Sequence, residues 1–138
     1  MVRIIIATHG ELAKSLIETA ELIIGTNHQM SYFCMTKSKS GEVGKRELTE
    51  LIYSDTLTDL VIFTDVYGGS VNNICSEILL SLPENETFHL VSGVNLPMIL
   101  TTIMTSYNED SLEAILTESI KEGRNGIKYI NELVKGVV

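Results

Sequence analysis

The feature that most constrains this chain is a set of short apolar runs, each ending in a small polar turn. Residues 2–7 (VRIIIA) and 59–64 (DLVIFT) are rich in aliphatic residues without regular apolar–polar alternation, as expected of strands covered on both faces. Residues 30–35 (MSYFCM) and 87–92 (TFHLVS) predict two further strands. Helical segments separate these runs. The sequence therefore predicts an α/β fold, with an open, mainly parallel sheet and helices on both faces.

Apolar spacing and capping residues define the expected helices. Residues 12–24 carry apolar side chains three or four positions apart and end before a glycine, and residues 45–54 form a weaker helical pattern. Three residue pairs are suited to begin the later helices: Asn72-Asn73, Leu96-Pro97 and Asp110-Ser111. Asn95 is expected either to cap a helix or to line a site. Met98 and Met104 are expected in the core.

The tail, residues 123–138, fits two structures. Gly123 and Gly126 weaken a helix, whereas the apolar residues that follow restore helical spacing. The tail is therefore expected to be either a helix or an added edge strand.

Length and charge limit the classes of function. With 138 residues, of which 44% are hydrophobic, the chain can bury one core, and we expect a single domain over residues 1–138. The formal net charge is −8, and the 10 Lys and Arg residues are scattered along the sequence. A nucleic-acid surface would need a basic stripe, so we expect no nucleic-acid partner.

The cysteines and the N-terminus indicate a compartment. Cys34 and Cys75 each lie in an apolar run and form no CxxC pair, which is typical of buried thiols in a reducing environment. The N-terminal apolar run is too short for a signal peptide, and no other run approaches the roughly 20 residues of a membrane span. We expect a cytoplasmic protein.

Two polar residues follow neighbouring buried strands. His9 comes after the first strand and Asp65 after the third, and in a 2-1-3-4 strand order both emerge at the same edge of the sheet. A carboxylate that accepts the Nδ1 proton of an imidazole leaves Nε2 unprotonated as a nucleophile. A surface histidine and a turn-forming aspartate would explain either residue alone. Together they predict a catalytic pair.

The glycine-rich turn after Asp65 is suited to a phosphoryl group. Gly68, Gly69 and Ser70 can offer backbone N–H groups, a hydroxyl and the positive end of a helix dipole, and Gly10 follows the histidine directly. We take these four residues as candidate phosphoryl contacts, although a tight strand-to-helix turn would have the same composition. No GxxxxGK[ST] loop and no cluster of metal ligands is present, so we expect a protein phosphoryl donor, no metal and no cofactor.

These segments resemble a known family, the enzyme IIA component of the mannose-type sugar phosphotransferase system (PTS). The resemblance covers nearly the whole chain. It rests on four segments: Thr8-His9-Gly10, the turn Thr64 to Ser70 with Asn73, Gly93 to Met98, and Glu122-Gly123-Arg124. The family commonly has proline where this chain has Val71, which leaves His9 and Asp65 in place.

The resemblance implies a fold and a pathway. It implies a sheet of order 2-1-3-4 with an added edge strand, and a homodimer. It further implies that the phosphocarrier HPr phosphorylates His9 at Nε2, that Asp65 is its partner, and that a IIB component accepts the phosphoryl group. Membrane subunits IIC and IID are implied indirectly, and the transported sugar stays open. Two alternatives remain: the phosphocarrier subunit of dihydroxyacetone kinase, and a regulatory module that senses phosphorylation without relaying it.

Overall fold

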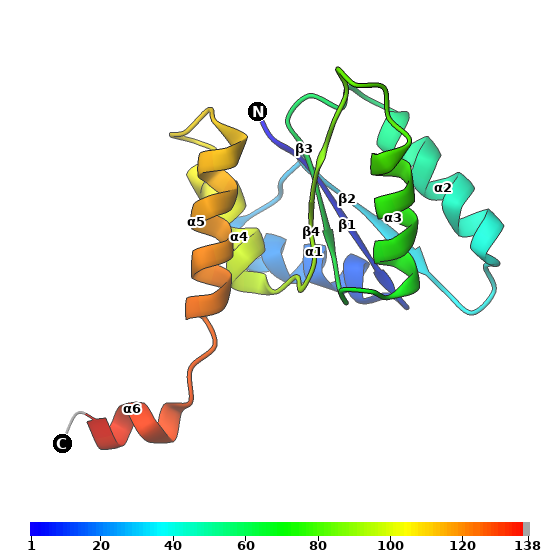
Figure 1. Cartoon of the computed structure of the whole chain (residues 1–138). Helices are drawn as coiled ribbons and strands as arrows, with labels where there is room; N and C mark the ends of the chain where they lie inside the picture. The colour runs from blue at the N-terminus through cyan, green and yellow to red at the C-terminus, as the bar shows by residue number, and fades with distance from the viewer. Residues whose placement is uncertain (137–138) are drawn as a thin grey trace. The chain divides into compact units, whose positions relative to one another are not determined.

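The apolar runs form a four-stranded, all-parallel sheet (Figure 1). Its strands are β1 (Arg3–His9), β2 (Met30–Met35), β3 (Leu60–Thr64) and β4 (His89–Val91), in the order β2-β1-β3-β4. The side chains of residues 4–7 in β1 and of residues 60–64 in β3 have no exposed surface. The predicted α/β class and the 2-1-3-4 order are confirmed.

The computed structural model describes residues 1–136, which divide into two compact units. Residues 1–94 contain the sheet, and the unit that begins at Asn95 is helical. Residues within each unit contact one another more than they contact the other unit, but this does not show that either unit folds alone. The expected single domain therefore stays a prediction.

In the first unit, helices cover both faces of the sheet, as expected (Figure 1). α1 (Leu12–Ile24) packs on β1 and β2 from one side, and α2 (Gly41–Tyr53) and α3 (Ser70–Leu80) lie on the other. Alternate strand residues face the α2–α3 side, where they share one apolar core. The largest members of that core are Ile5, Phe33, Leu48, Ile52, Leu60, Ile62, Ile78 and Phe88.

Several element boundaries differ from the sequence prediction. β1 continues two residues beyond the predicted end, so His9 is its last residue. α2 begins at Gly41 because the hydroxyl of Ser40 accepts the N–H of Val43 as a cap. α3 begins at Ser70 with Gly69 as its N-cap residue. The expected start at Asn72-Asn73 was therefore wrong, and these asparagines bond elsewhere.

The second unit contains α4 (Leu96–Thr105), α5 (Leu112–Asn125) and α6 (Ile130–Gly136). A Cβ at Gly123 would lie 3.1 Å from the Cε of Met98, and one at Gly126 would lie 2.8 Å from the Cγ of Pro97. Gly123 lies inside α5 and Gly126 is its C-cap residue, so both permit close packing of the end of α5 on α4. At Gly123 this packing outweighs the low helix propensity of glycine. The tail is helical over residues 123–125, at the end of α5, and over residues 130–136 in α6, with residues 126–129 outside both helices, and the added edge strand does not form in the described part of the chain. The part of that expectation that falls on residues 137–138 lies outside the described residues.

The structure also tests the predictions for Asn95 and for the two methionines of α4. Asn95 caps the helix, because its Oδ1 accepts the N–H of Met98 (3.0 Å) and its Nδ2 donates to the carbonyl of Gly123 (3.0 Å). Met98 is buried, as predicted. Met104 is 57% exposed, so its expected place in the core was wrong.

Candidate functional site

His9 and Asp65 meet at the carboxyl edge of the sheet. His9 ends β1, and Asp65 directly follows β3, the neighbouring strand. The ring Nδ1 of His9 lies 2.9 Å from Oδ2 of Asp65, and the backbone N–H of His9 donates to the same oxygen (3.0 Å). The expected adjacency of these two residues is therefore present. Their chemical roles stay a prediction.

The carboxylate of Asp65 is held by three donors. Besides its two contacts with His9, it accepts the N–H of Val66 at Oδ1 (3.0 Å). Partial burial acts to raise the pKa of Asp65, but the hydrogen bonds from the backbone and ring of His9, together with the charge of that ring, outweigh burial and hold the pKa below its usual range. Asp65 is therefore ionised at neutral pH and can only accept hydrogen bonds.

The second nitrogen of the His9 ring contacts a hydroxyl. Nε2 lies 3.0 Å from Oγ of Ser70, the first residue of α3. Because the carboxylate of Asp65 accepts only, Nδ1 carries the single proton of the neutral ring; in that form Nε2 has a free electron pair, and the hydroxyl of Ser70 donates to it. The side chain of His9 is 46% exposed, so the ring can be approached from solvent.

The glycines bring the turn close to the ring. A Cβ at Gly69 would lie 3.0 Å from Cε1 of His9, so only glycine fits without displacement of the ring or turn. Gly68 adopts a φ of +80°, which favours glycine. Two of the candidate phosphoryl contacts already use their amides: Gly69 donates to the carbonyl of Val66 (3.1 Å), and Gly10 donates to that of Met35 (2.9 Å).

The first turn of α3 contains backbone N–H groups that have no acceptor within the helix. The first amide to bond within the α3 turn is that of Asn73, which donates to the carbonyl of Gly69 (2.9 Å). The amides of Ser70, Val71 and Asn72 precede it and therefore have no acceptor inside the helix. These groups and the helix dipole favour an anion at the start of α3. The geometry can thus hold a nucleophilic nitrogen beside an anion site.

A comparison with protein families decides the assignment. The family model EIIA-man, described as PTS system fructose IIA component, matches residues 3–120. The chain belongs to this family. The predicted resemblance is confirmed, and IIA components of this family are phosphotransferases that act through a histidine.

Individual relatives agree with the EIIA-man assignment. The chain is 27% identical over 130 residues to the PTS system mannose-specific EIIAB component of Escherichia coli strain K12, a match that covers 94% of this chain and 39% of the relative. It is 32% identical to a sugar PTS permease structure from Klebsiella pneumoniae, with a TM-score of 0.81 and coverage of 96% and 93%. An EIIA structure from Streptococcus agalactiae shares the fold, with a TM-score of 0.86, 20% identity and coverage of 96% and 99%.

These comparisons bear on the two alternatives. They support a mannose-type IIA component and give no support to a dihydroxyacetone kinase subunit or to a purely regulatory module. The chain spans 39% of the length of the curated EIIAB relatives.

Two contacts of this EIIA-man chain escaped the sequence analysis. The amide nitrogen of Asn73 donates to the carbonyl of Gly68 (3.1 Å), and the hydroxyl of Thr64 donates to Oδ1 of Asn72 (2.7 Å). The sequence pattern alone predicts both asparagines to be helix caps. The signal that could have revealed the second contact is the polar residue Thr64 at the end of the apolar run LVIFT.

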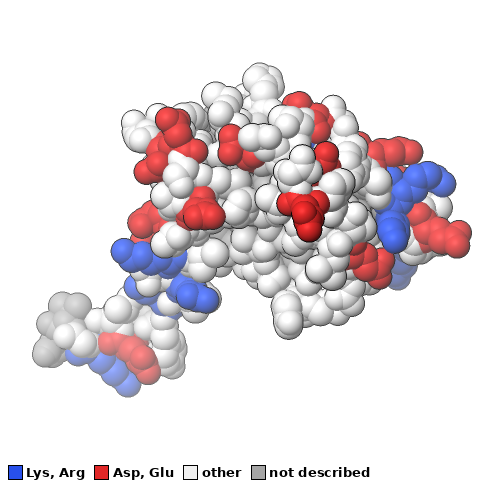
Figure 2. Space-filling view, turned by 45° about the horizontal axis from the view of Figure 1, so that its top comes forward, with Lys and Arg blue, Asp and Glu red and all other residues white. Residues whose placement is uncertain are grey.

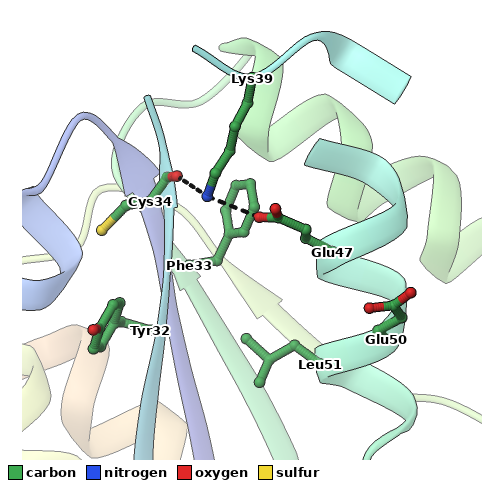
Figure 3. Close-up of a pocket in the computed structure, with 7 residues that line it drawn as sticks. All are labelled: Tyr32, Phe33, Cys34, Lys39, Glu47, Glu50 and Leu51. Carbon is green, nitrogen blue, oxygen red and sulfur yellow. Dashed lines mark hydrogen bonds and ion pairs between the residues drawn. The ribbon is translucent and has the colours of Figure 1, made fainter. Parts of the chain in front are cut away.

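A groove lies apart from His9, between β2 and α2 (Figure 3). Lys39 crosses it, bonds the carbonyl of Cys34 (2.7 Å), pairs with Glu47 (2.8 Å) and lies over the ring of Phe33. Its ammonium group is thus already occupied by protein groups. The lining residues are Tyr32, Phe33, Cys34, Lys39, Glu47, Glu50 and Leu51.

Three further features of the described residues bear on function: the surface charge, possible metal ligands and possible membrane-spanning helices. Figure 2 shows acidic side chains dispersed over the visible face, with basic side chains in two areas that also contain acidic ones. Among residues 1–136, no cluster of three or more His, Cys, Asp or Glu side chains is arranged to hold a metal ion. None of the helices in the same range combines the length and the apolar character needed to cross a bilayer.

Proposed function

We propose that this EIIA-man chain is a phosphocarrier that accepts a phosphoryl group on Nε2 of His9 and passes it to a partner protein during sugar uptake. The observation that carries the proposal is the placement of the ring. Asp65 bonds Nδ1 and Ser70 bonds Nε2, at the start of a helix with open amides. A phosphoryl acceptor needs this combination of an oriented nucleophile and nearby anion donors.

The transfer step follows from that geometry. The electron pair on Nε2 attacks the phosphorus of a phosphohistidine donor, a new N–P bond forms, and the N–P bond of the donor breaks with its electron pair returning to the donor ring. His9 then carries a proton on Nδ1 and a phosphoryl group on Nε2. The carboxylate of Asp65 stabilises the positive charge that develops on this ring. In the second transfer a nucleophile of the next carrier attacks the same phosphorus, the N–P bond at Nε2 breaks, and its electron pair returns to the ring of His9.

The phosphoryl oxygens need donors once they arrive. The hydroxyl of Ser70 is already within 3.0 Å of Nε2, so a rotation about its side-chain bond would redirect it to an oxygen of the bound group. The amides of Ser70, Val71 and Asn72 are the nearest open backbone donors on α3. Gly68 and Gly69 act mainly by allowing the turn to approach the ring, and Gly10 by turning the chain after His9 with a φ of +59°.

The pathway partners belong to the same proposal. HPr is the donor, a IIB component is the acceptor, and the membrane subunits IIC and IID act downstream. We further propose that the chain works in the cytoplasm as a homodimer. The family assignment supports a place in the PTS cascade, and no residue of the site identifies the sugar.

Reconstituted phosphotransfer tests the proposal. The chain is incubated with phosphoenolpyruvate, enzyme I and HPr, and then with candidate IIB domains. We expect an acid-labile, base-stable adduct that His9→Ala abolishes and that discharges onto a IIB domain. His28→Ala is the matched control, because His28 is exposed and lies outside the site. Absence of an adduct on the wild-type chain, or its persistence in His9→Ala, would contradict the proposal.

A further inference from the structure

A buried polar pair joins the two ends of the turn that holds His9. Thr64 is the last residue of β3 and is 0% exposed, and Asn72 lies in the first turn of α3 and is 6% exposed. The hydroxyl of Thr64 donates to Oδ1 of Asn72 at 2.7 Å. A hydrogen bond between buried side chains is little weakened by water, so it fixes the separation of the two residues.

The residues between this pair carry the contacts to the ring. Asp65 follows Thr64 directly and bonds Nδ1 of His9, and Ser70 stands two residues before Asn72 and bonds Nε2. Both nitrogens of the ring are therefore held from opposite ends of one six-residue turn, residues 65–70. A change in the separation of those ends would therefore disturb at least one of the two ring contacts.

The amino acids at these positions are not explained by packing alone. The four residues before Thr64 in β3 are apolar and fully buried, and valine would fill the space of threonine without a hydroxyl. Asn72 likewise has the buried apolar neighbours Val71 and Cys75 on its own helix. A polar group at such a position is costly unless it is bonded, so the Thr64–Asn72 contact accounts for both residue types.

We propose that Thr64 and Asn72 are positioning residues for His9, which keep Asp65 and Ser70 at the spacing that holds the ring with its proton on Nδ1. This inference rests on the proposed function of His9. Thr64 and Asn72 act through Asp65 and Ser70 and bind no substrate. Other bonds within the turn, such as that from Asn73 to the carbonyl of Gly68, fix its middle rather than its ends.

The test compares variants that remove or retain the hydroxyl. Thr64→Val removes it at nearly constant volume, and Thr64→Ser keeps it. Thr102→Val is the matched control, because Thr102 donates to Oγ of Ser119 (2.8 Å), both residues are fully buried, and both lie in the unit that begins at Asn95. Two readouts are taken on each full-length variant: the ring nitrogen chemical shifts of His9, and the rate of phosphoryl uptake against the concentration of phosphorylated HPr.

We expect Thr64→Val to shift the ring signals away from the Nδ1-protonated form. It should also lower the maximal uptake rate about 10-fold with the half-saturating donor concentration unchanged. Thr64→Ser should stay within about twofold of the wild type, and Thr102→Val should leave both readouts unchanged. Wild-type ring signals and rate in Thr64→Val would overturn the proposal, and so would an equal loss in Thr102→Val.

Two further outcomes are also decisive. If Thr64→Val does not fold, the double variant Thr64→Val with Asn72→Leu leaves no unpaired polar group and must show the same change in ring signals. If the wild-type chain takes up no phosphoryl group, the proposed function fails. The ring signals then decide the positioning role alone, and it is overturned if they do not change in Thr64→Val.

Discussion

One carboxylate oxygen, Oδ2 of Asp65, contacts both the backbone N–H of His9 (3.0 Å) and its ring Nδ1 (2.9 Å). The first contact fixes the end of β1 against the turn after β3, and the second fixes the rotation of the ring. The carboxylate of Asp65 thus constrains both the orientation and the tautomer of the His9 ring, and it is itself held by the backbone N–H of Val66.

Asp65→Asn removes the negative charge of the side chain while nearly keeping its shape. Asparagine retains an oxygen near His9, but it can present an N–H₂ group to Nδ1 and does not stabilise a positive ring. We expect the rate of phosphoryl uptake to fall by roughly 10²- to 10⁴-fold, in line with the loss of an orienting carboxylate at other histidine sites. Single-turnover uptake from phosphorylated HPr measures this, with circular dichroism as the folding control. A rate within threefold of the wild type would contradict the role of Asp65.

The lowered pKa of Asp65 predicts the pH dependence of stability. A carboxyl whose pKa is lower in the folded chain stabilises the fold fully above its unfolded pKa of about 3.9, and this contribution is lost as the pH falls through the folded pKa. We therefore expect the wild type to lose free energy of unfolding relative to Asp65→Asn between about pH 5 and pH 2. Urea titrations across this range measure the difference, and a relative gain at low pH would refute it.

Gly69→Ala tests the close approach of the turn to the ring. Gly69 has a φ of −72°, which alanine adopts without strain, so the added Cβ acts only through its contact with Cε1 of His9 at 3.0 Å and with the carbonyl of Val66 at 3.2 Å. We expect uptake to slow about 10-fold because the ring is displaced. Gly41→Ala is the matched control, since a Cβ there meets no atom within 4 Å. Equal rates in the two variants would argue against a tight fit.

Ser70→Ala tests the contact at Nε2. Removal of the hydroxyl takes away one hydrogen bond, which corresponds to about 1 kcal/mol, so we expect a rate reduction of about 5- to 10-fold, smaller than that of Asp65→Asn. Ser76→Ala serves as a control on the same helix, because among residues 1–136 the Ser76 hydroxyl bonds the backbone carbonyl of Asn72 and no group of the site. A larger loss in Ser70→Ala than in Asp65→Asn would reverse the assigned importance of the two contacts.

Cys75 offers a probe of global unfolding. It is fully buried, and burial raises the pKa of its thiol to about 12, so the native thiol stays protonated and unreactive at pH 8. We expect iodoacetamide to modify Cys75 at a rate that increases with urea in parallel with unfolding. Mass spectrometry of quenched samples follows the reaction, and rapid modification without denaturant would contradict the burial.

The sheet and the pairing of His9 with Asp65 were accessible from the sequence for a physical reason. Fully apolar runs such as IIIA and LVIF leave little choice other than buried parallel strands, and the residues after adjacent strands must meet at one edge. The position of Asp65 followed from this rule once the strand order was assumed. The family resemblance supplied the partners and the transfer step.

The features that the sequence pattern did not predict depend on contacts between residues far apart in the sequence. Asn72 has the composition of a cap, and only the fold brings it to Thr64 and moves the start of α3 back to Ser70. Gly123 and Gly126 suggest a broken helix, and α5 does end at Asn125 with Gly126 as its C-cap residue. It continues through Gly123, where only the proximity of Met98 explains the glycine. Helix propensity gives the free-energy cost of placing a residue in a helix. It contains no information on the tertiary packing that can offset this cost.

The nitrogen that carries the phosphoryl group tests the central claim most directly. Because Nδ1 of His9 bonds Asp65, the electron pair available for attack is on Nε2. After incubation with phosphoenolpyruvate, enzyme I and HPr, nuclear magnetic resonance of the phosphorylated chain distinguishes the two phosphohistidine isomers. We predict a single phosphoryl group on Nε2 of His9. A phosphoryl group on Nδ1, on another residue, or on no residue would contradict the account.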